Sequence, residues 1–163
     1  MNLQRMGVQN TVITKMEGRW FKTPFDKILL DAPCSGSGLI KGETKRSLDT
    51  LKMWNPNYIK SMGRAQKKMI SHAFSLLKDN GTLIYSTCSL EPEENEKVVD
   101  SLLNKFENAK LEKIDLKIKS ELNLDYGDYS SELKKCIKLW PQFYDSEGFF
   151  IAKFKLLEEI KEK

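Results

Sequence analysis

The chain has 163 residues, of which 40% are hydrophobic and 31% are charged, and its formal net charge at pH 7 is +4. This length and composition indicate one soluble globular domain with its own core, and they exclude a membrane-spanning protein because no apolar run approaches the roughly 20 residues of a span. Residues 1–10 lack the apolar core of a secretory signal, so we expect a cytoplasmic protein that uses no membrane.

The cysteines, Cys34, Cys88 and Cys136, are far apart in the sequence, and His72 is the only histidine. This usage favours neither a disulfide framework nor a zinc site. We therefore expect no metal, and free thiols in a reducing compartment. The positive net charge permits an anionic partner but does not establish one.

Two stretches near the N-terminus have the composition of strands. Residues 11–16, TVITKM, are rich in β-branched side chains and follow Gly7, which is suited to end a helix. Residues 25–33 contain the apolar triplet 28–30, which is typical of a strand buried on both faces.

The middle of the chain predicts a helix followed by a strand. Residues 55–81 keep apolar side chains at a helical period, and Asn80 with Gly81 predicts the end of that helix. Residues 82–87, TLIYST, are predicted to form the next buried strand.

A second helix is predicted to begin at Pro92, because proline suits the first turn and the neighbouring glutamates suit the positive end of the helix dipole. Its predicted buried face consists of Val98, Val99, Leu102, Leu103 and Phe106. Residues 136–140 and 149–156 predict an antiparallel hairpin, whereas the lysine-rich stretch 108–135 is ambiguous.

Strands that alternate with helices predict an α/β sheet, mostly parallel, with an antiparallel strand at its end. Asp31 and Cys34 follow one predicted strand, and Cys88 follows the next. If these strands are neighbours, their carboxyl ends meet at one edge of the sheet, where such folds bind ligands. We therefore expect both thiols to face one pocket.

A carboxylate and two thiols at one edge suit chemistry on an electron-poor heterocycle such as cytosine. Carbon 5 of cytosine is too weak a nucleophile to accept a methyl group unaided. A thiolate that adds to carbon 6 converts carbon 5 into an enamine carbon, which can attack a sulfonium methyl. An acid near N3 neutralises the developing charge, and a base then removes the proton from carbon 5.

At this point two motifs carry a family resemblance. DAPCSGSG, from Asp31, and STCSLEPEENEKVV, which contains Cys88, resemble the paired motifs of the Sun (Nol/Nop/Sun) family of RNA cytosine-C5 methyltransferases. The resemblance extends to residues 2–10 and 148–154, and so covers almost the whole chain. It implies S-adenosylmethionine as cofactor and RNA, either tRNA or rRNA, as substrate.

The resemblance also implies roles for single residues. Cys88 matches the nucleophile, and Cys34 matches the thiol that assists release of the methylated product. Asp31 matches the aspartate between cofactor and target base, and Pro33 in the same motif is assigned to cofactor binding. Glu17 occupies the position of the acid that binds the adenine end of the cofactor, although the family usually has aspartate there.

The resemblance further implies an incomplete domain. It places residues 1–163 in a Rossmann-like class I methyltransferase sheet, with strand order 3-2-1-4-5 and a hairpin beyond. No glycine-rich cofactor loop precedes Asp31, so we expect the first two strands to be absent from between segments 11–16 and 25–33. An N-terminal methyltransferase half, or a second copy of the chain, is then expected to cover the open strands.

Two alternatives stay open. One is a non-catalytic RNA-binding or assembly module that keeps the fold. The other is an amino-methyltransferase with a D-P-P-Y type motif, although Cys34 stands where the stacking tyrosine is required.

Other residues are also ambiguous in function. Cys136 and His72 are predicted to be structural. Trp54 and Trp140 either stack on bases or pack. Lys138 stands where the family tends to have arginine, which leaves a point charge for phosphate.

Overall fold

The structure is a computed structural model that describes residues 2–41, 44–116, 118 and 129–158. Its helices are α1 (Asn2–Arg5), α2 (Lys45–Met53), α3 (Pro56–Ser75) and α4 (Glu96–Leu103), with short 3-10 turns η1 (Gly18–Trp20), η2 (Ser37–Leu39) and η3 (Ser131–Lys135). Its strands are β1 (Phe25–Asp31), β2 (Leu77–Thr87), β3 (Ala109–Glu112), β4 (Ile137–Leu139) and β5 (Phe149–Leu156).

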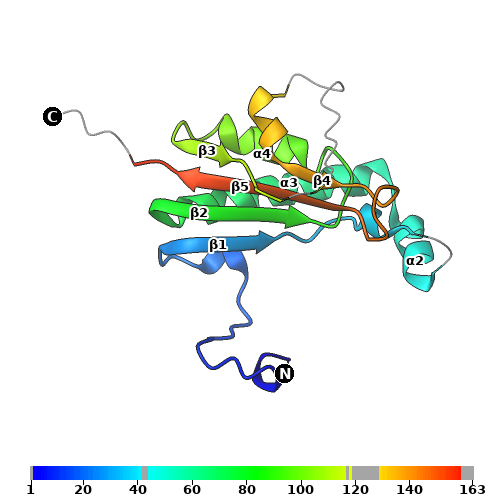
Figure 1. The fold of residues 1–163 in the computed structure, drawn as a ribbon, viewed down its shortest axis with the longest axis horizontal. Helices are drawn as coiled ribbons and strands as arrows, with labels where there is room; N and C mark the ends of the chain where they lie inside the picture. The colour runs from blue at the N-terminus through cyan, green and yellow to red at the C-terminus, as the bar shows by residue number, and fades with distance from the viewer. Residues whose placement is uncertain (1, 42–43, 117, 119–128, 159–163) are drawn as a thin grey trace.

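The strands form one mixed sheet in the order β1-β2-β5-β3, and β4 also pairs with β5 (Figure 1). β1 and β2 are parallel, whereas β5 is antiparallel to β2, β3 and β4. The predicted α/β sheet and its C-terminal hairpin, β4 and β5, are therefore confirmed. The parallel part is a single strand pair among the described residues, so it is smaller than predicted.

One face of the sheet packs against α3 and α4, which lie behind it in Figure 1. Burial alternates from Gly81 to Tyr85 in β2 and from Phe149 to Phe154 in β5, and every second side chain there is buried in this core. The largest fully buried members are Ile70, Phe74, Leu83, Tyr85, Leu102, Leu111, Phe150 and Phe154. The sheet and these two helices thus form two layers around one core.

β1 differs from the prediction of a strand buried on both faces. Ile28 and Leu30 are partly buried against the core, but Leu29 between them is 70% exposed. The reason is that α3 and the core cover only one face of β1, to which Ile28 and Leu30 point. Among the described residues no element covers the face to which Leu29 points.

The prediction of a strand at residues 11–16 is wrong. These residues belong to no strand, and Val12 and Ile13 are 90% and 59% exposed. A strand needs a partner to accept its backbone hydrogen bonds, and the described sheet ends at β1. The predicted end of the preceding helix is confirmed, because Gly7 has φ +72° directly after α1 and Val8 N–H donates to the Leu3 carbonyl at 3.0 Å.

α3 begins as predicted and ends earlier. The Asn55 side chain accepts a hydrogen bond from Tyr58 N–H at 2.8 Å, and proline follows at the first helical position. The helix ends at Ser75 because Leu77 already pairs with Phe25 as the first residue of β2. The turn signal at Asn80, which has φ 59°, therefore falls inside β2 and not at a helix end.

α4 begins at Glu96, after turns at residues 92–95, and not at Pro92. Its predicted buried face is confirmed: Val98, Val99 and Leu102 are fully buried, and the remaining members pack against the core. β3 was not predicted, because it is short and lies in the ambiguous lysine-rich stretch. Residues 117 and 119–128 of that stretch lie outside the described residues.

Candidate active site

The parallel pairing of β1 and β2 brings the two cysteine turns together. Asp31 is the register partner of Ser86, and Ala32 N–H continues the ladder to the Ser86 carbonyl at 3.0 Å. The segments after both strands then turn, and the Sγ atoms of Cys34 and Cys88 lie 3.0 Å apart. The expectation that the two cysteine turns are adjacent is confirmed, whereas a pocket faced by both thiols stays a prediction. We call Asp31, Cys34 and Cys88 the thiol site.

Glycine permits the close approach of three loops behind this site. Gly38 N–H donates to the Cys88 carbonyl at 2.9 Å, and Gly148 N–H donates to the Gly38 carbonyl at 2.7 Å. A Cβ atom at position 38 would lie 2.4 Å from the Gly148 oxygen and 2.8 Å from the Cys88 oxygen. Any side chain there would force the loops apart, so Gly38 is required by packing.

The pKa values of the two thiols are shifted in opposite directions. The hydrogen bond from the Cys34 thiol lowers the pKa of Cys88 from 9.0 to about 7, against the opposing effect of partial burial. The same hydrogen bond and burial raise the pKa of Cys34. The positive charge of Arg46 also lowers the pKa of Cys88, whereas the negative charge of Asp31 raises it. These shifts favour the ionised form of Cys88 and the protonated form of Cys34.

The remaining residues of the first motif are held by neighbouring elements. The Asp31 carboxylate is exposed and accepts a hydrogen bond from Ser86 Oγ at 2.9 Å. The Pro33 carbonyl accepts one from Gln66 Nε2 of α3 at 2.8 Å. Asp31 therefore lies at the solvent side of the strand ends, and Pro33 connects the Cys34 turn to the helical layer.

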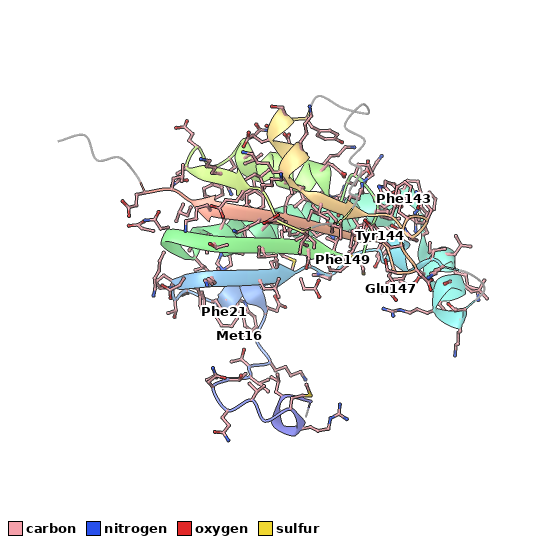
Figure 2. The ribbon with its side chains drawn as sticks, viewed as in Figure 1. Met16, Phe21, Phe143, Tyr144, Glu147 and Phe149 are labelled. Carbon is pink, nitrogen blue, oxygen red and sulfur yellow. The ribbon has the colours of Figure 1, made fainter. Side chains whose placement is uncertain are left out.

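Glu17 shares no hydrogen bond or ion pair with the thiol site. Its exposed carboxylate pairs with Arg19 near η1. Figure 2 shows Met16 and Phe21, on either side of it in sequence, below β1 on the side away from β2. A largely apolar cavity of about 420 Å³, which we call the edge pocket, lies between η1, β1 and α3; Val12, Phe21, Leu29 and Met69 are among its lining residues.

A second depression, of about 470 Å³, lies beside the Cys34 turn and is lined by Ser35, Lys45, Arg46, Asp49, Thr50 and Met53. Its basic side chains, Lys45 and Arg46, come from the N-terminal end of α2. Arg46 is two-thirds exposed and lies 3.4 Å from Glu147, on the loop before β5 where Figure 2 labels Glu147 beside α2. Sequence analysis missed Arg46, because its place near Cys88 depends on how the connection after Cys34 folds.

Glu94 is the other residue that sequence analysis did not identify for the site. The sequence predicts it as an acid at a helix start, but the structure buries it completely between the two cysteine turns. The available signal was its position in the acidic EPEEN run directly after Cys88. That signal does not distinguish Glu94 from its acidic neighbours, which are more exposed or face elsewhere.

The structure supports the structural interpretation of Cys136 and His72. Burial raises the pKa of Cys136 to about 12, and the His72 ring is within hydrogen-bond distance of the Phe21 carbonyl at 3.1 Å. Lys138 is no surface charge for phosphate, because it is 3% exposed and its ammonium donates to Glu96 at 2.7 Å.

The two tryptophans differ in their surroundings. Trp54 is 42% exposed and its indole N–H donates to Glu91 at 2.8 Å, so its ring lies at the surface close to the segment after Cys88. The Lys138 ammonium lies 5.3 Å from the ring centre of Trp140. Neither contact excludes stacking on a base.

Within the described part of the chain, no group of three or more His, Cys, Asp or Glu side chains is arranged to hold a metal ion. In the same residues no helix is long and apolar enough to cross a membrane.

The chain is similar to RNA methyltransferases over nearly its whole length. It is 42% identical to the ribosomal RNA small subunit methyltransferase F of Shewanella piezotolerans, over 98% of this chain and 33% of that protein. It is 40% identical to the tRNA (cytosine(49)-C(5))-methyltransferase of Pyrococcus abyssi, over 94% of this chain and 50% of that one. The chain thus spans about a third to a half of these relatives.

Solved structures agree with the fold. A methyltransferase homolog protein from Pyrococcus horikoshii aligns with a TM-score of 0.80 and 35% identity over 96% of this chain and 48% of its own. NSun6 from the same organism, solved with SFG, aligns with a TM-score of 0.77 and 30% identity over 97% of this chain and 38% of its own. The family model of 16S rRNA methyltransferase RsmB/F matches residues 1–155. The resemblance to the Sun family is confirmed, and the chain belongs to the RsmB/F methyltransferase family.

Proposed function

We propose that residues 1–163 are the catalytic part of a methyltransferase domain that transfers a methyl group from S-adenosylmethionine to carbon 5 of cytosine in tRNA or rRNA. The observation that carries the proposal is the thiol pair: the Sγ atoms of Cys34 and Cys88 lie within hydrogen-bond distance, 3.0 Å apart, and this contact lowers the pKa of Cys88 to about 7. A thiol with that pKa is substantially ionised near neutral pH, which nucleophilic addition to carbon 6 requires.

Each residue of the thiol site has one proposed role. The Cys88 thiolate forms a bond to carbon 6 and moves electron density to carbon 5. The Asp31 carboxyl is exposed at the strand end beside Cys88, and in its protonated form it donates a hydrogen bond to N3, where negative charge develops. Once carbon 5 carries the methyl group, a base removes its proton, and that electron pair re-forms the double bond between carbons 5 and 6 as the bond from Cys88 to carbon 6 breaks. Cys34 then donates a hydrogen bond to the departing thiolate, for which its Sγ atom, 3.0 Å from that of Cys88, is placed.

The described residues fit part of the cofactor. When bound, S-adenosylmethionine supplies the methyl group. Asp31 and Glu17 present exposed carboxylates suited to the hydroxyl, amino and sulfonium groups of the cofactor. Pro33 lies in the turn between Asp31 and Cys34. We propose these three residues for cofactor binding. Residues 1–30 contain no glycine-rich loop suited to the carboxylate of the cofactor.

We infer that an N-terminal methyltransferase half completes this domain by covering the edge pocket and β1. The pocket is largely apolar, and β1 has a free edge among the described residues. The curated relatives are two to three times as long as the matched region. A free strand edge beside exposed apolar side chains accepts a further strand readily.

Methyl transfer is tested with the chain supplied with the N-terminal half of the Pyrococcus abyssi relative, using methyl-labelled S-adenosylmethionine and cytidine-containing tRNA or rRNA transcripts. We expect label in 5-methylcytidine after nuclease digestion, and none when Cys88 is changed to alanine. If the assembled pair binds RNA and cofactor but transfers no label to either RNA, the proposal is wrong and a non-catalytic RNA-binding module is favoured.

Calorimetric titration of the chain alone tests the incomplete cofactor site. We expect no binding of S-adenosylmethionine at micromolar concentration, and binding once the N-terminal half is present. A monodisperse monomer that binds the cofactor alone would contradict the inferred division of the domain. Self-association through β1 without any affinity for the N-terminal half would assign the surface to a second copy.

A further inference from the structure

Glu94 lies fully buried between the two cysteine turns. One carboxylate oxygen accepts hydrogen bonds from the Ser35 backbone N–H and the Gln66 side-chain amide, both at 2.9 Å. The other oxygen accepts from Ser89 Oγ at 2.8 Å. Burying a carboxylate is costly unless its lone pairs are satisfied, and these three donors satisfy it. One side chain therefore contacts the residue after Cys34 and the residue after Cys88.

Gln66 connects the same carboxylate to the other side of Cys34. Its side chain is fully buried on α3, and its Nε2 also donates to the Pro33 carbonyl at 2.8 Å. Both partners of Nε2 are acceptors that cannot donate, so the amide orientation is fixed. Gln66 of α3 thus holds Pro33, and Glu94 holds Ser35, with Cys34 between them.

A group of serines adds shorter connections between the two turns. Ser35 Oγ and Ser37 Oγ each lie 3.3 Å from Ser89 Oγ. Ser37 Oγ also accepts from Leu90 N–H at 2.9 Å, and Ser89 Oγ accepts from Glu91 N–H at 3.1 Å. Because Glu94 accepts the Ser89 hydroxyl proton, it orients this group as well.

We propose that Glu94 is the positioning residue of the thiol pair, and that it fixes the spacing of Cys34 and Cys88 through Ser35, Ser89 and Gln66. Glu94 contacts neither sulfur atom and acts through the backbone of the two turns. Its importance for methyl transfer rests on the proposed function, since displacement of a reacting group by about 1 Å can cost a hundredfold in rate. The spacing itself is a property of the chain without cofactor or RNA.

Glu96 offers a matched control. It is also buried, at 2% exposure, and lies two residues further along the same segment. Its partner is the buried Lys138, at 2.7 Å, and it makes no hydrogen bond to either cysteine turn. Changing either glutamate to alanine removes a buried carboxylate and leaves its donors unpaired, so both changes are expected to lower thermal stability.

The test is thiol–disulfide exchange with glutathione. Two protein thiols and one oxidised glutathione give one Cys34–Cys88 disulfide and two reduced glutathiones, and the equilibrium constant is the effective concentration of one thiol at the other. Peptide mass spectrometry separates this disulfide from Cys136. We expect Glu94→Ala to lower the effective concentration at least about tenfold, because the two turns lose their common anchor.

Two variants show whether the loss in Glu94→Ala comes from the position of the two turns, from the missing charge or from lower stability of the fold. In Glu94→Gln the amide oxygen can accept from Ser35 and Gln66 while its NH₂ donates to Ser89 Oγ, so we expect a loss below about threefold. Glu96→Ala is expected to keep the wild-type effective concentration despite its lower melting temperature. A folded Glu94→Ala chain with wild-type exchange would overturn the proposal, as would an equal loss in Glu96→Ala.

If Glu94→Ala gives no cooperative melting transition, Gln66→Met replaces it. This change fills the same volume and removes the donor to Glu94 and Pro33, so we expect a fall of at least about threefold. An unchanged value in this variant would equally overturn the proposal. The exchange contains neither RNA nor cofactor, so its failure leaves the proposed methyl transfer standing, and failure of methyl transfer leaves the exchange result standing.

Discussion

The two sides of the β1–β2 pair differ in how far the chain completes them. At the carboxyl ends of these strands, polar groups are buried and paired: Glu94, Gln66 and Ser89 are inaccessible to solvent and hydrogen-bonded. At the outer side of β1, apolar groups are exposed: Leu29 is 70% and Val12 is 90% exposed beside the edge pocket. Polar groups are thus buried at one end, and apolar groups are exposed along the other side.

This difference indicates which part of the chemistry the chain contains. In this buried network the Glu94 carboxylate accepts three hydrogen bonds, and these connect the two cysteine turns through residues of this chain. An exposed apolar surface next to a free strand edge indicates a surface that another element covers. The proposed nucleophile and proton donor, Cys88 and Cys34, therefore lie at the carboxyl ends of the strands, and the surface proposed for the N-terminal half lies along the outer side of β1.

The largest effect is expected from the nucleophile itself. Changing Cys88 to serine in the assembled enzyme is expected to lower methyl transfer at least about a thousandfold, because a hydroxyl is not ionised near neutral pH. The measurement is incorporation of labelled methyl groups into RNA. Near wild-type turnover in a folded Cys88→Ser enzyme would show that the thiol site is structural.

Cys34 is expected to act at a later step. Without its thiol the departing Cys88 thiolate loses its hydrogen-bond donor, so Cys34→Ala should accumulate RNA joined covalently to Cys88. Denaturing electrophoresis detects this species, and the Cys34→Ala, Cys88→Ala double variant should lack it. If the single variant shows no covalent RNA with competent cofactor and substrate, Cys34 has no role in release.

A substitution on the outer side of β1 is expected to change association with the N-terminal half and to leave the reactivity of the thiols unchanged. Leu29→Lys places a charge on the surface beside the edge pocket and is expected to weaken binding of the N-terminal half at least about tenfold, because that charge would be desolvated in the complex. Leu48→Lys is the matched control, since Leu48 is also exposed, at 47%, but lies on α2. Sedimentation measures both. Equal binding by the two variants would place the interface elsewhere.

Much of the thiol site at the carboxyl ends of β1 and β2 was predictable from the sequence. Two apolar runs that each end in a cysteine turn are enough to place Cys34 and Cys88 at one edge, because parallel neighbours end together. The burial of Glu94 was not predictable in the same way. It depends on Gln66, which is 28 positions away in sequence, and a carboxylate in an acidic run is ordinarily exposed.

The errors on the other elements have local causes. Leu77 suits both a helix face and a strand, and its pairing with Phe25 decides for β2. Residues 11–16 have strand composition, but strand propensity is realised only with a partner strand. Lys138 was interpreted as a surface charge because its sequence neighbours do not reveal Glu96, which lies 42 positions earlier.

The smallest effect concerns the acidity of Cys88 and needs no N-terminal half. Because the pKa of Cys88 is lowered to about 7, its alkylation by iodoacetamide should rise with pH and reach half its maximum near that value. The hydrogen bond from Cys34 is the largest cause of the lowering, so Cys34→Ala should move the midpoint upward, toward the ordinary value of 9.0. Leu29→Lys should leave the midpoint unchanged, since Leu29 belongs to the other side of the comparison. Peptide mass spectrometry of partially alkylated chains measures each rate. If the midpoint for Cys88 in the unaltered chain equals that in Cys34→Ala, the two thiols do not share a proton. The thiol site then lacks the electrostatic coupling that its geometry indicates.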